Sequence, residues 1–82
     1  MNEKTIIKGC SEEMLKKLLK RHDRYVPLAW RGLDMKRLLI LLKEEIEELE
    51  ISIAKNNKKM MSDGGVDIAN YGMFIWDIMR KK

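Results

Sequence analysis

The sequence predicts an all-α fold, an antiparallel helical bundle of three main helices that is completed by oligomerisation. Apolar residues recur three and four positions apart through most of the chain, which is the spacing of one helix face. No segment shows the alternation of apolar and polar residues that is typical of a strand. Hydrophobic residues make up 45% of only 82 residues, more apolar material than three short helices can bury by themselves.

The first helix is expected to begin at Ser11, within a single domain that spans residues 1–82. Residues 1–10 lack a clear period, and we expect them to form a flexible arm. Ser11 is a favourable N-cap because its hydroxyl can accept a hydrogen bond from the first turn, and the two glutamates that follow suit the positive end of the helix dipole. The helical pattern of apolar residues fades near Arg24.

A loop and a longer helix follow. Residues 25–32 include Pro27, the only proline of the chain, and this composition is typical of a loop. Asp34 is the expected N-cap of a second helix that extends to about Lys55. Five apolar residues are predicted to form its core-facing stripe: Leu38, Leu42, Ile46, Leu49 and Ile53.

The third helix is predicted to start between Lys58 and Ser62 and to extend to Met79 or beyond. It is apolar on two sides. One stripe contains Ile68, Tyr71, Ile75 and Met79, and the other contains Val66, Ala69, Met73 and Trp76. A helix that is apolar nearly all round is buried from both sides. We therefore expect the second side to face another subunit, in a homodimer or homotetramer.

Composition and charge limit the classes of function. The net charge is +4, and the basic excess lies mostly near the two ends of the chain. This balance suits a pocket for a phosphate-bearing small molecule, whereas the lack of a recognition-helix pattern argues against nucleic acid. The single cysteine, Cys10, cannot form an internal disulfide, and no apolar segment reaches signal-peptide or membrane-spanning length. We expect a cytoplasmic protein without membrane contact.

Acidic residues on the second and third helices supply the candidate site. Glu45 and Glu48 are three residues apart and share one helix face, which Glu44 also reaches from one turn before Glu48. Glu47 and Glu50 point elsewhere and are expected to be surface charges. A narrow arc of the third helix contains Asp63, Asp67, Asn70, Phe74 and Asp77.

If these two faces meet, carboxylate oxygens from both helices converge on one place. Hard oxygen ligands, with room for water and phosphate, suit Mg²⁺ or Mn²⁺. Zinc is disfavoured because the chain has one histidine, His22, and no cluster of nitrogen or sulfur ligands. The alternative is that the glutamates form an ordinary solvated face, since glutamate is a good helix former.

Residues 42–49 (LKEEIEEL) and 66–71 (VDIANY) resemble the motifs of the all-α nucleotide pyrophosphohydrolase superfamily, in its MazG-like branch. The pattern of that family is E-x-x-E, a variable spacer and E-x-x-D. The segment Trp30-Arg31-Gly32 is similar to the tryptophan-containing segment that precedes the E-x-x-E helix in many members. The resemblance covers roughly residues 21 to 79 and implies an all-α NTP pyrophosphatase-like fold.

The resemblance also implies an activity. Such enzymes cleave a nucleoside triphosphate, (d)NTP, between the α and β phosphates to give (d)NMP and pyrophosphate, in nucleotide-pool house-cleaning. By this resemblance Glu45, Glu48 and Asp67 are the catalytic residues that hold Mg²⁺, or Mn²⁺. Asn70 and Trp30 are candidates for substrate binding. Basic residues in and after the first helix are candidates for phosphate contact: Lys16, Lys20, Arg21 and Arg24.

The chain departs from the family pattern at position 64, where Gly64 replaces the third acidic ligand. Asp63, one turn before Asp67, is the candidate substitute ligand, and Glu44 and Asp77 are further candidates. Two functions therefore remain open. The chain is an active pyrophosphohydrolase, or it is a catalytically degenerate relative that serves as a helical nucleotide-binding or interaction protein.

Overall fold

The computed structural model describes residues 1–21 and 27–81. Three α-helices account for most of them: α1 (Glu3–Arg21), α2 (Met35–Ala54) and α3 (Lys58–Arg80). A short 3-10 helix, η1 (Ala29–Gly32), precedes α2, and no strand occurs in either described range. The prediction of an all-α fold with three main helices is confirmed. In the same ranges no helix combines the length and the apolar character needed to cross a membrane.

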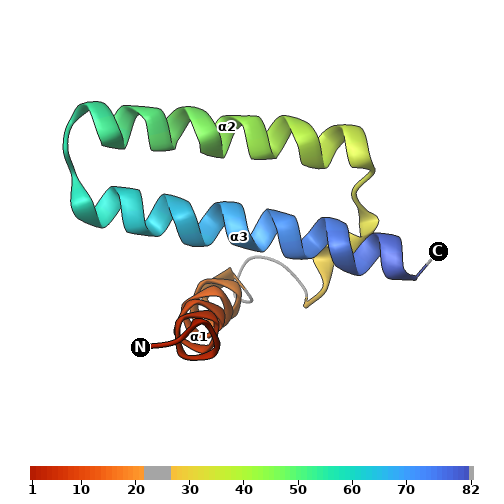
Figure 1. Cartoon of the computed structure of the whole chain (residues 1–82). Coiled ribbons are helices and arrows are strands. Elements are labelled where there is room, and N and C mark those ends of the chain that lie inside the picture. Colours follow the sequence, from red (N-terminus) through yellow and green to blue (C-terminus); the bar gives the residue numbers. More distant parts are fainter. Residues whose placement is uncertain (22–26, 82) are drawn as a thin grey trace.

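Helix α3 is central and contacts α1, α2 and η1. In Figure 1, α2 and α3 lie side by side and antiparallel, joined by a tight turn. Helix α1 lies on the other side of α3 and is viewed along its axis, so it crosses α3 instead of running antiparallel to it. The molecule is therefore a helical hairpin crossed by a third helix, which corrects the predicted antiparallel arrangement of all three helices.

Helix α1 includes most of the segment that was predicted to be an arm. The Asn2 side chain accepts a hydrogen bond from the Thr5 backbone N–H at 3.0 Å, so a cap is present at the start of the chain. The Ser11 hydroxyl donates to the Lys8 carbonyl oxygen at 2.9 Å, inside the helix. The predictions of a flexible arm over residues 1–10 and of an N-cap at Ser11 are wrong. The segment lacks an apolar period because α1 contains no buried residue.

Short polar side chains cap the starts of α2 and α3, and the predicted cap at Asp34 is confirmed. The Asp34 carboxylate accepts a hydrogen bond from the Arg37 backbone N–H at 2.7 Å and caps α2. Between the two helices, Asn56 has a φ of 52°, a left-handed conformation that asparagine tolerates better than most residues. The Asn57 side chain then accepts from the Met60 backbone N–H at 3.1 Å and caps α3. The predicted end near Arg24 lies outside the described residues.

A small aromatic core joins α2, α3 and η1. Its buried apolar side chains are Leu38, Tyr71 and Phe74. The Trp30 ring stacks on Phe74 with centroids 4.5 Å apart, and Tyr71 meets Phe74 edge-on at 5.4 Å. Trp30 therefore anchors η1 in the core.

The face of α2 that packs on α3 differs from the predicted stripe. Ile46 and Ile53 are 41% and 57% exposed, whereas Ser52 is 1% exposed. A serine can occupy this position because its hydroxyl donates to the Leu49 carbonyl oxygen of its own helix at 2.7 Å, so no polar group is left without a partner. The rotation of α2 exposes Ile46 and Ile53 and turns Glu45 toward α3.

The buried Asp77 carboxylate ties η1 to the C-terminal part of α3. Arg31 donates to it through Nε at 2.8 Å and through Nη2 at 3.1 Å. Trp30 Nε1 donates at 3.1 Å, and Arg80 pairs with it at 3.2 Å. The hydrogen bonds from Arg31 hold the pKa of the Asp77 carboxyl well below its usual range. Asp77 is thus fully paired, and it does not join the other acids as a ligand.

Arg31→Ala is expected to lower the melting temperature by several degrees, because it removes two of the hydrogen bonds to a buried carboxylate. Arg37→Ala, an exposed arginine on α2, is the matched control and is expected to have little effect. The folded-state pKa of Asp77 lies below its ordinary value of 3.8, so the pair stabilises the fold fully above that pH. Thermal unfolding should show the deficit of the variant narrowing as the pH falls below that value, and an unchanged deficit would contradict this assignment.

Candidate functional site

Carboxylates of α2 and α3 approach one another where the two helices pack. Glu45 is half-buried, and its Oε2 atom is buried without a hydrogen-bond partner among the described residues. Burial, followed by the charges of Asp67 and Glu48, raises the pKa of the Glu45 carboxyl from its ordinary 4.5 to about 7. The fold therefore places Glu48 and Asp67 near enough to Glu45 for their charges to act on its carboxyl.

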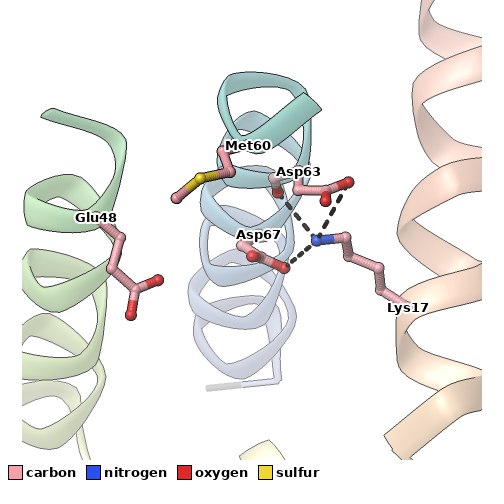
Figure 2. Close-up of a pocket in the computed structure, with 6 residues that line it drawn as sticks. Lys17, Glu48, Met60, Asp63 and Asp67 are labelled. Carbon is pink, nitrogen blue, oxygen red and sulfur yellow. Dashed lines mark hydrogen bonds and ion pairs between the residues drawn. The ribbon is translucent and has the colours of Figure 1, made fainter. Parts of the chain in front are cut away.

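Helix α1 supplies a lysine to the acids of α3. Lys17 Nζ donates to Asp67 Oδ1 at 3.0 Å and to the Asp63 carbonyl oxygen at 3.1 Å, and it lies 4.0 Å from Asp63 Oδ1. Figure 2 shows the lysine reaching from α1 across to both aspartates. Lys17 and Asp67 are only 28% and 21% exposed, so water screens their charges incompletely.

Arg21 follows Lys17 by one helical turn and lies near the other end of the acidic cluster. Its charge lowers the pKa of the Glu45 carboxyl, although burial outweighs this effect. Burial also raises the pKa of the Tyr71 hydroxyl, again against the effect of Arg21. Of the other predicted phosphate contacts, Lys16 and Lys20 are exposed and Arg24 lies outside the described residues. Among the described ones, Arg21 is the predicted basic residue whose charge acts on the acids.

A shallow, open depression of about 250 Å³ lies over the first turns of α3. Its lining consists of Lys17, Glu48, Met60, Asp63, Gly64 and Asp67. In Figure 2, Glu48 projects from one side of the depression and Lys17 from the other, with α3 between them. Gly64 is buried, and a Cβ atom added to it would lie 3.4 Å from Leu49 Cδ1. The absence of a side chain at this position therefore allows α2 to approach α3 closely.

The acidic side chains have the right chemistry for a divalent cation, but their present positions do not allow them to share one. Hard carboxylate oxygens and the unpartnered Glu45 Oε2 are what Mg²⁺ prefers. However, within residues 1–21 and 27–81 no group of three acidic, histidine or cysteine side chains is close enough to hold a metal ion. Asp67 is directed toward Lys17 instead. The side chains must rearrange locally before they can share a cation.

The remaining predicted site residues lie in other surroundings. Glu44 is exposed on α2. Trp30 packs in the core and donates to Asp77, so it does not face the acids. Asn70 is buried against α1, where its Nδ2 donates to the Met14 carbonyl oxygen at 3.3 Å, while its Oδ1 has no partner among the described residues. Asn70 therefore contributes to the packing of α1 on α3.

Lys17 is the site residue that the sequence analysis did not distinguish. It belongs to a run of basic residues in α1, and its neighbour Lys16 pairs with Glu13 on the exposed side of the same helix. No local pattern separates the two lysines by function. The direction in which α1 crosses α3 places Lys17 against Asp67 and leaves Lys16 on the exposed side of the helix.

Comparison with known proteins gives one significant relative. No family model matches the chain, and no solved structure matches it significantly. A protein of Archaeoglobus fulgidus, described as uncharacterized, is 35% identical over 66 residues, which cover 78% of this chain and 71% of the archaeal protein. That description assigns neither an activity nor a ligand, so the site has to be interpreted from its own residues.

Metal-free protein is expected to lose stability as the pH rises from about 5 to about 8, because the folded-state pKa of Glu45 lies above its unfolded value. Its protonated form favours folding below pH 4.5, and this contribution is lost as the pH passes about 7. In Glu45→Gln the decrease in the free energy of unfolding between these pH values should be smaller by on the order of 1–2 kcal/mol. This difference is less than the full pKa shift implies, because the side chain is partly exposed to water.

Denaturant unfolding at both pH values measures the effect. Glu47→Gln is the control, since Glu47 is exposed. Parallel pH profiles for wild type and Glu45→Gln would show that Glu45 is not held in a desolvated, acid-flanked environment.

Proposed function

We propose that this chain, which belongs to the same family as the Archaeoglobus fulgidus protein, is a metal-dependent nucleoside triphosphate pyrophosphohydrolase that cleaves (d)NTP to (d)NMP and pyrophosphate. The observation that carries the proposal is the buried, unpartnered oxygen of Glu45 between the charges of Glu48 and Asp67. Acids gathered in this way are costly to the fold unless a cation compensates them. A site that accepts this cost is a candidate for function.

In this proposal, residues of α2 and α3 hold the cation and residues of α1 contact the phosphates. When bound, a divalent cation would neutralise phosphate oxygens and polarise the phosphorus centre, with Glu45, Glu48 and Asp67 holding it. In the metal-free protein, burial and the neighbouring acids raise the pKa of Glu45 to about 7, and a bound cation would favour the ionised form that acts as its ligand. Lys17 and Arg21 place positive charge on the α1 side, where phosphate oxygens can be bound.

The size of the depression limits what it can accept. Its volume of about 250 Å³ is below the roughly 300–1,000 Å³ of typical small-molecule pockets. It can therefore accommodate the phosphates of a nucleotide but not the base and sugar as well. We propose that these parts lie outside the depression, against the rim or against a second subunit.

We place this activity in the cytoplasm, in a nucleotide-pool role. Free nucleoside triphosphates are the substrate class, and the exposed thiol of Cys10 is suited to a reducing compartment.

Purified protein with Mg²⁺ or Mn²⁺ is expected to release pyrophosphate from at least one of a panel of canonical and modified nucleoside triphosphates. Glu45→Gln and Glu48→Gln should each lower the rate by about 100-fold or more, because each removes a carboxylate that would hold the cation. Glu47→Gln and Glu50→Gln change exposed glutamates of the same helix and should retain activity. A failure to release pyrophosphate, together with the absence of Mn²⁺ binding by calorimetry, would contradict the proposal.

A second function is favoured by two observations, Gly64 in place of an acid and the pairing of Asp67 with Lys17. A catalytically degenerate relative that binds nucleotides or a partner would have these features. In that case Gly64→Glu should create activity or raise it sharply, with a small movement of Leu49 to admit the new side chain. Efficient turnover by the wild type would count against this second function.

We also propose that a second copy of the chain covers part of this molecule. The accessible surface is 6575 Å², whereas a compact monomer of 9.7 kDa exposes about 5,100 Å². The excess of about 1,500 Å² is more than the roughly 800 Å² that each partner buries in a standard interface. The radius of gyration, 13.6 Å, likewise exceeds the about 11.7 Å of a compact domain of this length.

The surface best suited to the second copy is an apolar stripe on α2. Leu39, Ile46 and Ile53 are spaced seven residues apart and are 49%, 41% and 57% exposed. This spacing is that of a helix–helix contact between copies, in a homodimer or as one interface of a homotetramer. Trp76, 63% exposed, and Met79, 50% exposed, extend the apolar surface on α3.

Light scattering coupled to size exclusion should give a mass at least twice 9.7 kDa for the wild type. The double variant Leu39→Glu/Ile53→Glu should move to the monomer mass, because a buried carboxylate without a partner disfavours association. Arg37→Glu, which makes the same change of two charge units at an exposed residue on the opposite side of α2, is the control. A monomeric wild type would rule out the interface.

A further inference from the structure

The attachment of α1 to α3 depends on few contacts. None of its residues is buried. Its half-buried Leu18 packs against the core, and Asn70 donates to the Met14 carbonyl oxygen. The ammonium of Lys17 contacts Asp67 and Asp63, and Arg21 acts on Tyr71 one turn further along α1. The lysine that holds α1 is thus bound to the same carboxylate that the proposed cation requires.

We propose that Lys17 is the internal cation of this site: it occupies Asp67 in the resting protein, and it has to leave before a divalent cation can bind, so the docking of α1 controls metal access. This inference rests on the proposed metal-dependent function. It names a regulatory contact within that site.

The geometry gives the reason for competition. Lys17 Nζ is 3.0 Å from Asp67 Oδ1, the distance of a charge-assisted hydrogen bond, and both side chains are largely shielded from water. A cation bound by Asp67 would therefore lie beside a second positive charge in a region of low effective dielectric constant. One of the two charges has to move. Lys17 can move, since its flexible stem belongs to a helix that buries no residue.

The position of Lys17 also explains why the carboxylates of Glu45, Glu48 and Asp67 do not converge on one point. With Lys17 in place, Asp67 is directed toward α1 and away from Glu48. Without it, Asp67 is free to join the two glutamates, since its charge already acts on the carboxyl of Glu45. The freed ammonium remains at the rim of the depression, on the α1 side.

Binding of Mn²⁺ alone, without nucleotide, tests the proposal in the full chain. Lys17→Met removes the charge and keeps most of the apolar stem, and it should bind Mn²⁺ about tenfold more tightly than the wild type, as expected for removing a nearby like charge. Lys17→Arg, which keeps the cation, should bind as weakly as the wild type. Lys8→Met makes the same charge change at an exposed position of α1 and should leave affinity within about twofold, because exposed distant charges are screened.

The outcomes separate this inference from the proposed function. Mn²⁺ binding by the wild type with no gain in Lys17→Met would overturn the competition while leaving the metal site in place. An absence of Mn²⁺ binding in every variant, Lys17→Met included, would overturn both. Far-UV circular dichroism of each variant shows whether the helices persist.

A measurement on the wild type keeps the test independent of any variant. Amide hydrogen exchange over residues 10–21 should become faster when Mg²⁺ is saturating, because α1 loses the contact of Lys17 with Asp67. Exchange in α2 should slow or stay the same. Unchanged protection of α1 at saturating Mg²⁺ would contradict displacement of the lysine.

Discussion

Helix α3 is packed on both sides, against α2 on one and against α1 and η1 on the other, and the rest of the structure depends on this arrangement. In a chain of 82 residues only one helix can be enclosed in this way, so α1 and α2 each keep a wide exposed surface. Asp67 and Asp77 of α3 are therefore carried toward the interior, where their side chains are 21% and 6% exposed, whereas Asp63 stays exposed. Asp67 and Asp77 each need a partner from a neighbouring element.

Asp77 and Asp67 show two ways in which that need is met. Asp77 receives two hydrogen bonds from Arg31 and one from Trp30, and Arg80 pairs with it. Asp67 receives one from Lys17 and stands near Glu45, whose carboxyl it helps to hold in a neutral form. The pKa of Asp77 falls and that of Glu45 rises, because donors surround the first and acids and apolar groups surround the second. The arrangement around Asp77 stabilises the fold. The arrangement around Asp67 and Glu45 leaves an excess of negative charge that a cationic ligand can neutralise.

Gly64 links the packing of the hairpin to the chemistry of the site. Because Gly64 has no side chain, α3 lies against Leu49 at this position. The depression beside Gly64 is also lined by Glu48 and Lys17. An acid at this position would have entered the space between α2 and α3 and added a fourth carboxylate to the cluster. Lys17 instead supplies a positive charge to Asp67, which partly offsets the charge of the acidic cluster.

The sequence by itself determined the helices whose signals are local. Asp34 and Asn57 cap α2 and α3 through hydrogen bonds that span three residues, and the arc that holds Asp67, Asn70 and Asp77 follows from helical periodicity alone. The rotation that buries Ser52 and exposes Ile46 and the selection of Lys17 from a row of lysines were decided only by the tertiary structure. They depend on the angle at which helices distant in the sequence cross, and no nearby residue encodes that angle.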